Sequence, residues 1–218
     1  MVPSEVRVLE YLDATGASPF ADWFDGLDGL AAAKVTVALA RIGQGNLSNV
    51  KGVGAGVLEY RIDFGPGYRV YFGRDGDSLV ILLAGGTKRR QQHDIATAQA
   101  RWADYKSDER RKSEMALTKE FKETVKARAD RDPAFRQALL TEAVEQLLSG
   151  DLETGKAVLR DYINATIGFE ALAKATGTPP KSLMRMLGPR GNPRASNLLA
   201  VLGKLQRVSR VHLAVTAG

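Results

Sequence analysis

The sequence contains no cysteine and only two histidines among its 218 residues. A chain without cysteine forms no disulfide bond, no thiolate metal site and no cysteine nucleophile, and two histidines are too few for an ordinary zinc site. The longest apolar run, Leu79 to Ala84, is far too short to cross a bilayer. The N-terminus lacks the basic and apolar stretches of a secretory signal. These absences predict a cytoplasmic protein that needs no metal or other cofactor and contacts no membrane.

Common catalytic and nucleotide-binding motifs are missing as well. The glycines between Gly52 and Gly56 precede a strand pattern instead of opening a helix, so they do not form a phosphate-binding loop. No nucleophile and base stand at the spacing of a known motif. His93 lies on a predicted helix beside Asp94, where a surface histidine is the usual outcome.

Acidic residues are absent from the C-terminal part of the chain. From Met1 to Lys112 there are fifteen Lys and Arg against fourteen Asp and Glu, whereas eight basic residues and no acidic residue follow Glu170. A solvated basic face is one interpretation. The other is that the C-terminal part approaches a polyanion such as a nucleic acid.

The chain changes character near residue 110. Strand patterns and glycines dominate before this point, and helical patterns dominate after it. The stretch from Lys106 to Glu114 is wholly polar, as expected of a linker, and Met115 looks like the start of a second protein. We therefore predict two domains, residues 1–108 and 115–218, joined by a linker of residues 109–114.

The first half has the pattern of an α+β domain. Apolar residues alternate in its strand segments, and Ser18 followed by Pro19 is typical of a helix start. The predicted order is one strand, two helices, three strands and a final helix, with a mostly antiparallel sheet. The segments are Glu5–Leu12, the helix from Ser18, Leu30–Ile42, Val57–Asp63, Tyr68–Arg74, Ser78–Ala84 and about Gln91–Tyr105.

A hairpin is predicted around the Gly-Pro-Gly segment that follows Phe64. The apolar residues of both flanking strands fall at even positions, so the two sets share the core face only if the loop has an odd number of residues. A three-residue loop that pairs Phe64 with Tyr68 satisfies this condition. Arg61, Arg69 and Tyr71 then lie together on the opposite, exposed face of the sheet.

The second half is predicted to be helical, with a short strand at its end. Asp132 before Pro133 is suited to cap one helix, and Asp151 is suited to cap the next. The predicted elements are helices over Thr118–Ala129, Asp132–Ser149, Asp151–Thr166, Gly168–Thr176, Pro179–Leu187 and Ala195–Gln206, and a strand over Val211–Val215.

Residues 169–187 have the spacing of a helix-turn-helix. Counting from Phe169, a small residue is fifth (Ala173), glycine is ninth (Gly177) and an aliphatic residue is fifteenth (Leu183). The small side chain lets the second helix approach, the glycine forms the turn, and the leucine is buried between the helices. A generic helical hairpin shares this spacing, but the absence of acidic residues after Glu170 favours a DNA-binding motif.

In a helix-turn-helix the second helix enters the major groove with its N-terminal part. We therefore expect Lys181, Ser182 and Arg185 to face base edges. The remaining candidate DNA-binding residues are Lys174, Arg190, Asn192 and Arg194. The alternative for each is an ordinary side chain in solvent.

The stretch Gly168–Leu205, in which Gly-Asn-Pro follows the second helix, resembles HigA-like antitoxins of the addiction module antidote group. The resemblance covers about the last ninety residues and is strongest from Ala171 to Pro193. It implies a DNA-binding antitoxin.

Three motifs of the first half resemble a toxin family. They match, in order, RelE/ParE-superfamily toxins of the HigB-like addiction module killer group, over about residues 5–105. At Tyr60 the sequence departs from the leucine that the family commonly has. Such toxins usually lie immediately upstream of the antitoxin, which is the order of the two halves here. The motifs are Gly54–Arg61, Gly65–Phe72 and Leu82–Ile95.

The resemblance implies a metal-independent endoribonuclease, because many relatives cut mRNA on the ribosome. Cleavage needs a base near the ribose 2′-hydroxyl, cations beside the crowded phosphate and an acid for the leaving oxygen. Arg61 and Arg69 are candidates to hold the phosphate, and Lys88 is a candidate base or third cation. Tyr71 or Tyr68 would orient or stack on an RNA base. Further candidate RNA-binding residues are Arg89, Arg90 and Gln91.

Two alternatives to a nuclease stay open. The arginines have a structural interpretation, namely ion pairing with Glu59 and Asp63 across the hairpin. The first half would then be a ParE-like gyrase inhibitor, or an inactive domain of a DNA-binding repressor. Toxin and antitoxin genes are normally separate, so the fusion itself is either natural or an artificial joining near Met115.

The two resemblances together imply a type II toxin–antitoxin protein in one chain. The expected partners are operator DNA for the C-terminal half, and mRNA and the ribosome for the N-terminal half when it is released. We expect the early helices of the second half to pack against the toxin and silence it until the linker is cut, because fusion raises the effective concentration of the inhibitor. We also expect a homodimer or larger assembly, since operators are usually two-fold symmetric.

Overall fold

The computed structural model describes residues 6–107, 118–211 and 213 and has a mixed α+β fold. The chain divides into two compact units, Met1–Thr124 and Val125–Gly218. The division falls later than the expected linker of residues 109–114, which lies outside the described residues. The reason is that residues 118–124 pair and pack with the first unit. No helix in the described ranges is long and apolar enough to cross a membrane.

The first unit contains the predicted order of strands and helices, together with two short strands that were not predicted, β2 and β6. The elements are β1 (Arg7–Tyr11), α1 (Pro19–Asp25), α2 (Gly29–Gly43), β2 (Val50–Gly52), β3 (Val57–Ile62), β4 (Tyr68–Asp75), β5 (Leu79–Thr87), a 3₁₀ turn η1 (Lys88–Arg90), α3 (Gln91–Lys106), β6 (Thr118–Glu120) and the start of α5 (Phe121–Arg131).

These strands form one sheet in the order β2-β3-β4-β5-β1-β6. Strand β1 runs parallel to β5, and every other neighbouring pair is antiparallel. Local signals set the helix starts: the Ser18 hydroxyl accepts a hydrogen bond from the Ala21 amide, and the Asp28 carboxylate accepts one from the Ala31 amide. The sheet is therefore mostly antiparallel, as predicted.

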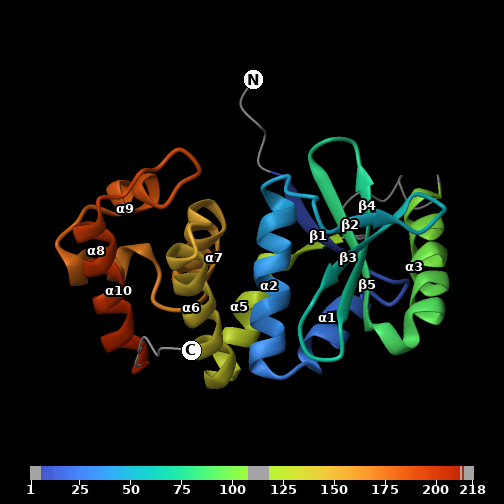
Figure 1. The fold of residues 1–218 in the computed structure, drawn as a ribbon, viewed down its shortest axis with the longest axis horizontal. Helices are drawn as coiled ribbons and strands as arrows, with labels where there is room; N and C mark the ends of the chain where they lie inside the picture. The colour runs from blue at the N-terminus through green and yellow to red at the C-terminus, as the bar shows by residue number, and fades with distance from the viewer. Residues whose placement is uncertain (1–5, 108–117, 212, 214–218) are drawn as a thin grey trace. The chain divides into compact units, whose positions relative to one another are not determined.

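Helices cover both faces of the sheet. Helix α2 lies on one face and α3 on the other (Figure 1). Two consecutive glycines at the end of β5 allow close packing on both sides. A Cβ at Gly85 would meet the Trp23 ring of α1 at 2.0 Å, and a Cβ at Gly86 would meet the Asp94 carboxylate of α3 at 2.0 Å. Side chains on both faces are consequently buried.

The hairpin between β3 and β4 has the predicted faces but a different register. Ile62, and not Phe64, lies opposite Tyr68, so the loop spans residues 63–67. The prediction of a three-residue loop is wrong because the chain turns earlier, with the Gly67 amide bonded to the Phe64 carbonyl. A shift of two residues leaves every side chain on its face. Arg61 and Arg69 are direct neighbours across the hairpin.

The second unit is helical. The Asp132 and Asp151 carboxylates accept hydrogen bonds from the amides of Phe135 and Thr154, so both predicted caps are confirmed. Its core includes the fully buried Leu139. The helices are the remainder of α5, then α6 (Pro133–Leu148), α7 (Leu152–Ala165), α8 (Phe169–Thr176), α9 (Pro180–Met186) and α10 (Ala195–Ser209).

Two predictions about the second half need correction. The segment Thr118–Ala129 was expected to be one helix, but its first three residues form β6 because they pair with β1. The final strand was expected over Val211–Val215. Val211 and Leu213 are not in a strand, and residues 212, 214 and 215 lie outside the described ones.

A carboxyl group is buried on β1, the strand next to the edge strand β6. Glu10, on β1, is fully buried. Burial raises the pKa of Glu10 above its ordinary value of 4.5, and the hydroxyls of Ser18 and Thr124 and the charge of Lys119 offset this only in part. The folded protein therefore favours the protonated, uncharged form of Glu10.

We expect Glu10→Gln to stabilise the protein at neutral and alkaline pH. Since the folded-state pKa lies above the unfolded value, the stability contributed by the protonated form is present at low pH and falls as the pH rises from about 4.5 through the folded pKa. Below this pH range the variant and the wild type should have the same free energy of unfolding. Above this range the free energy of unfolding of the variant should be larger by about 1–3 kcal/mol. Thermal unfolding at pH 4 and pH 8 measures this, with the exposed Asp77→Asn as control. Equal stabilities at both pH values would contradict it.

Candidate functional site

The face of the sheet covered by α3 contains a buried ion pair. Arg69 on β4 is 6% exposed and Glu59 on β3 is fully buried. The Arg69 Nε lies 3.4 Å from the Glu59 Oε2. The Arg69 Nη1 also donates to the Gly67 carbonyl at 2.8 Å, and the Gln91 side-chain amide donates to the Glu59 Oε2 at 2.8 Å. Glu59 therefore holds both an arginine of the hairpin and the first residue of α3.

Two further polar groups lie buried on this face. The Tyr71 side chain is fully buried, and its hydroxyl has no hydrogen-bonding partner among the described residues. Burial, and then the charge of Glu59, raise the pKa of Tyr71 well above its usual value. Burial likewise raises the pKa of Asp94, which lies over Gly86. Tyr71 consequently stays protonated at neutral pH and cannot serve as a base.

Exposed cations adjoin the buried pair. Arg61 lies opposite Arg69, its side chain is 56% exposed, and its Nη2 is 3.4 Å from the Asp63 carboxylate. Lys88 is exposed, and its backbone amide donates to the same Gly67 carbonyl that Arg69 contacts. The structure therefore brings together three of the predicted site residues. Arg89 and Arg90 follow Lys88 in η1 and are also exposed.

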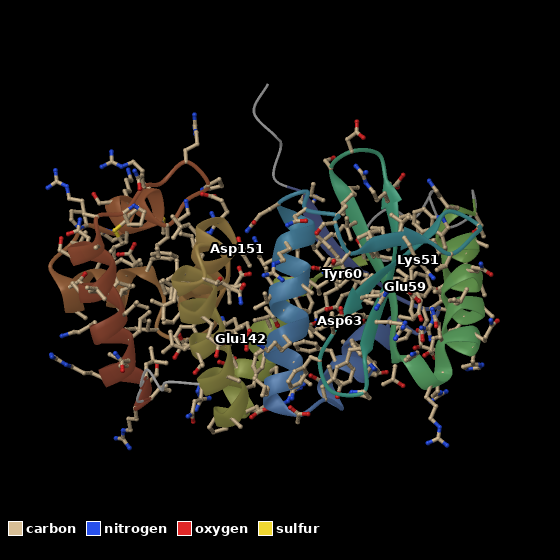
Figure 2. All side chains as sticks on the ribbon, in the orientation of Figure 1. Lys51, Glu59, Tyr60, Asp63, Glu142 and Asp151 are labelled. Carbon is tan, nitrogen blue, oxygen red and sulfur yellow. The ribbon has the colours of Figure 1, made fainter. Side chains whose placement is uncertain are left out.

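Sequence reasoning missed one member of this surface, Lys51. Lys51 on β2 lies directly opposite Glu59 in the sheet and is exposed, and Figure 2 shows both side chains on the half of the sheet near α3. Glu59 was expected as an ion-pair partner of the hairpin arginines, and its pair with Arg69 is present. We refer to the exposed side chains of this surface as the cationic surface: Lys51, Arg61, Lys88, Arg89 and Arg90.

Three expectations about this surface are corrected. Arg69 shares the face of Arg61, as predicted, but it is not exposed, because α3 and Glu59 cover it. Tyr71 cannot touch RNA because its side chain is fully buried. Tyr68 is half-buried, stacked on Phe64 and set edge-on to Trp23, so only part of its ring remains free. The ion pairs considered as the structural alternative, to Glu59 and Asp63, are both present.

The second unit has two short helices, α8 and α9, joined by a turn at the positions where the helix-turn-helix was predicted. Helix α8 ends at Gly177, whose φ of 69° is the left-handed conformation that glycine adopts most readily. Ala173 is 7% exposed and Leu183 is 1% exposed, so both predicted packing residues are buried. Pro179 caps α9 and Pro180 begins it. The spacing read from the sequence therefore produces two helices joined by a tight turn.

The candidate DNA-binding side chains lie on the outside of this motif. Lys181 and Arg185 are exposed on α9, whereas Ser182 is half-buried. Upstream of the turn, Lys174 is exposed on α8. Arg190, Asn192 and Arg194 are exposed in the loop before α10.

A buried lysine holds this loop. Lys156 on α7 is 3% exposed, and its Nζ donates to the Gly191 carbonyl at 2.7 Å and to the Glu153 carboxylate at 2.8 Å. Gly191 itself lies so close to the end of α9 that a Cβ would meet the Met186 carbonyl at 2.1 Å. The loop that carries Arg190 is thus fixed to α7 and to α9. Sequence reasoning did not single out Lys156.

A protein of Haemophilus influenzae named "Uncharacterized protein" is 44% identical to the chain over 80 residues. These residues make up 36% of this chain and 81% of that protein, so the relative is less than half as long as this chain. No family model matches the chain, and no solved structure matches it significantly.

Proposed function

We propose that this chain, which belongs to the same family as the Haemophilus influenzae protein, is a type II toxin–antitoxin protein with both partners in one polypeptide. The first unit is a RelE/ParE-like toxin that cleaves mRNA on the ribosome. The second unit is a HigA-like antitoxin that neutralises it and binds operator DNA through α8 and α9 to repress its own synthesis. The protein acts in the cytoplasm as a homodimer or larger assembly.

The observation that carries the toxin proposal is the cationic surface beside the buried Glu59–Arg69 pair. Arg61 on β3 lies opposite Arg69, which donates to the Gly67 carbonyl, and Lys88 in η1 donates to the same carbonyl through its amide; the side chains of Arg61 and Lys88 are exposed and can reach a phosphate. Such cations stabilise the extra negative charge that develops when a 2′-hydroxyl attacks the adjacent phosphate. Arg69 is a positioning residue in this proposal, because it holds the turn and not the substrate. Lys88 acts as the base or as a further cation.

Support for the DNA-binding proposal comes from exposure combined with charge. The outer side of α9 presents Lys181 and Arg185, and the sequence after Glu170 contains no acidic residue to repel phosphates. The length of the relative, less than half of this chain, agrees with a fusion in which one part also occurs as a separate protein.

A non-catalytic toxin is the second candidate, and the burial of Tyr71 and Arg69 favours it. A surface of exposed cations can bind a polyanion without cutting it. The first unit would then be a gyrase inhibitor of the ParE type or an inactive domain of a repressor.

One experiment separates these functions. Residues 1–124, the compact first unit, are added to programmed ribosomes, and mRNA cleavage is followed by primer extension. Cleavage supports the nuclease. Intact mRNA together with inhibited gyrase supercoiling supports the ParE-like alternative, and no effect in either assay leaves the inactive domain. Binding of the full chain to the DNA upstream of its own gene tests the repressor function.

A further inference from the structure

Residues 118–124, here called the anchor, belong to the second half of the sequence but are built into the first unit. Strand β6 adds to the edge of the sheet beside β1, with Leu9 opposite Glu120 and Tyr11 opposite Thr118. More than a hundred residues of chain separate these partners. An added strand gains main-chain hydrogen bonds and covers an edge that would otherwise be open to other chains.

Aromatic packing follows directly after the strand. Phe121 is 5% exposed, and its ring lies edge-on to Phe24 at 5.4 Å and to Phe20 at 5.9 Å between ring centroids. Both partners belong to α1 and are fully buried. Burial of a phenylalanine among aromatic rings is one of the strongest single contributions that a side chain makes to an interface.

Polar contacts fix the register of the anchor. The Arg7 guanidinium donates to the Glu120 carboxylate, with an N–O distance of 2.5 Å, at the solvent-exposed rim. Within the anchor itself, the Lys119 ammonium donates to the Thr124 hydroxyl at 3.0 Å. An apolar centre with a charged rim is the arrangement of a protein–protein interface.

The anchor is continuous with the second unit through helix α5. This helix begins at Phe121, inside the first unit, and continues to Arg131, past the division at Thr124. A chain break upstream of Thr118 would therefore leave the anchor attached to the second unit by helical backbone.

We infer that the edge of β1 with Phe20 and Phe24 is a docking surface for residues 118–124, and that this contact holds the two halves together independently of the chain through residues 108–117. Cutting that connection does not free the first unit. Release requires displacement of the anchor, contrary to the simple expectation that a cut suffices. The contact itself does not depend on the proposed function. Only the consequence of the contact for toxin release rests on that function.

The anchor does not itself cover the cationic surface. Strands β5 and β1 lie between β4, which carries Arg69, and β6. The anchor therefore links the two halves of the chain and does not block the cationic surface.

The test uses the full chain with a specific protease site inserted between Arg111 and Lys112. After cleavage, the wild-type halves should elute together in size-exclusion chromatography at about 1 μM. Phe121→Ala should weaken their association by at least about 100-fold, so that they separate. The exposed neighbour Lys122→Ala is the control and should behave as wild type.

A second pair of variants covers the case in which the uncut Phe121→Ala protein loses its circular dichroism spectrum. Glu120→Arg places two like charges at the exposed rim and should weaken association about fivefold, and the double variant Arg7→Glu with Glu120→Arg should restore it. Separation of the cut wild-type halves would overturn the inference. So would equal release by Phe121→Ala and Lys122→Ala, or failure of the charge swap to restore binding. No toxin assay enters these readouts, so loss of the nuclease proposal and loss of this inference are distinguishable.

Discussion

Replacing Arg61 by alanine should reduce ribosome-dependent mRNA cleavage by residues 1–124 by about 100- to 1000-fold, the usual loss when one donor to a developing negative charge is removed. Arg61 lies directly opposite Arg69 across the hairpin, and its guanidinium pairs with Asp63, whose side chain is 82% exposed. Because its side chain stands in solvent, the variant should fold normally. Cleavage rates from single-turnover primer extension, with thermal unfolding alongside, measure both quantities.

Arg74→Ala is the matched control for this prediction. Arg74 is an exposed arginine on the neighbouring strand, β4, and it lies at the end away from the Gly67 turn. Its loss removes the same charge and should change cleavage less than about twofold. If both variants lose activity equally, the effect comes from net charge, and the assignment of Arg61 to the phosphate is wrong.

Replacing Arg185 by alanine should weaken binding of the full chain to its operator by about 10- to 100-fold and relax the choice of base at one position in each half-site. Arg185 is exposed on α9, the second helix of the motif, while Leu183 of the same helix is buried against α8. A helix held by its inner face in this way presents its outer face to the groove. Fluorescence anisotropy with operator variants measures the affinity and the specificity.

Salt dependence separates base contacts from phosphate contacts in the same assay. Lys174→Ala should weaken binding to all sequences alike and lower the slope of log affinity against log salt by about one. Lys126, exposed on α5 and outside the motif, supplies the control, and its alanine variant should bind as wild type does. An Arg185→Ala protein with unchanged affinity and base preference would remove α9 from the DNA interface.

The helix-turn-helix shows how far local sequence reasoning reaches. Gly177 and Leu183 were assigned their positions from spacing, and the structure places the glycine in a left-handed turn and the leucine in the core. The capping aspartates were found in the same way. These features depend on neighbours within one or two turns, whose geometry is common to all helices.

Strands β2 and β6 could not be predicted in this way. Each has three residues, and the residues of β6, Thr118 to Glu120, are polar. Neither segment is long or apolar enough to show a period of two. They are strands because a neighbouring edge offers them hydrogen-bonding partners, which for β6 lie more than a hundred residues away in the sequence.

The sequence alone determined the mixed α+β class of the fold, the helix starts with a capping side chain and the two sides of the β3–β4 hairpin, because alternation and capping act over a few residues. Tertiary structure decided which of the hairpin arginines stays in solvent. Both lie on one face, and only the packing of α3 and the carboxylate of Glu59 bury Arg69 while Arg61 remains exposed. A buried charge requires an ion-pair partner and a segment that shields it from solvent. Here both come from residues too distant in the sequence for a local pattern to reveal them.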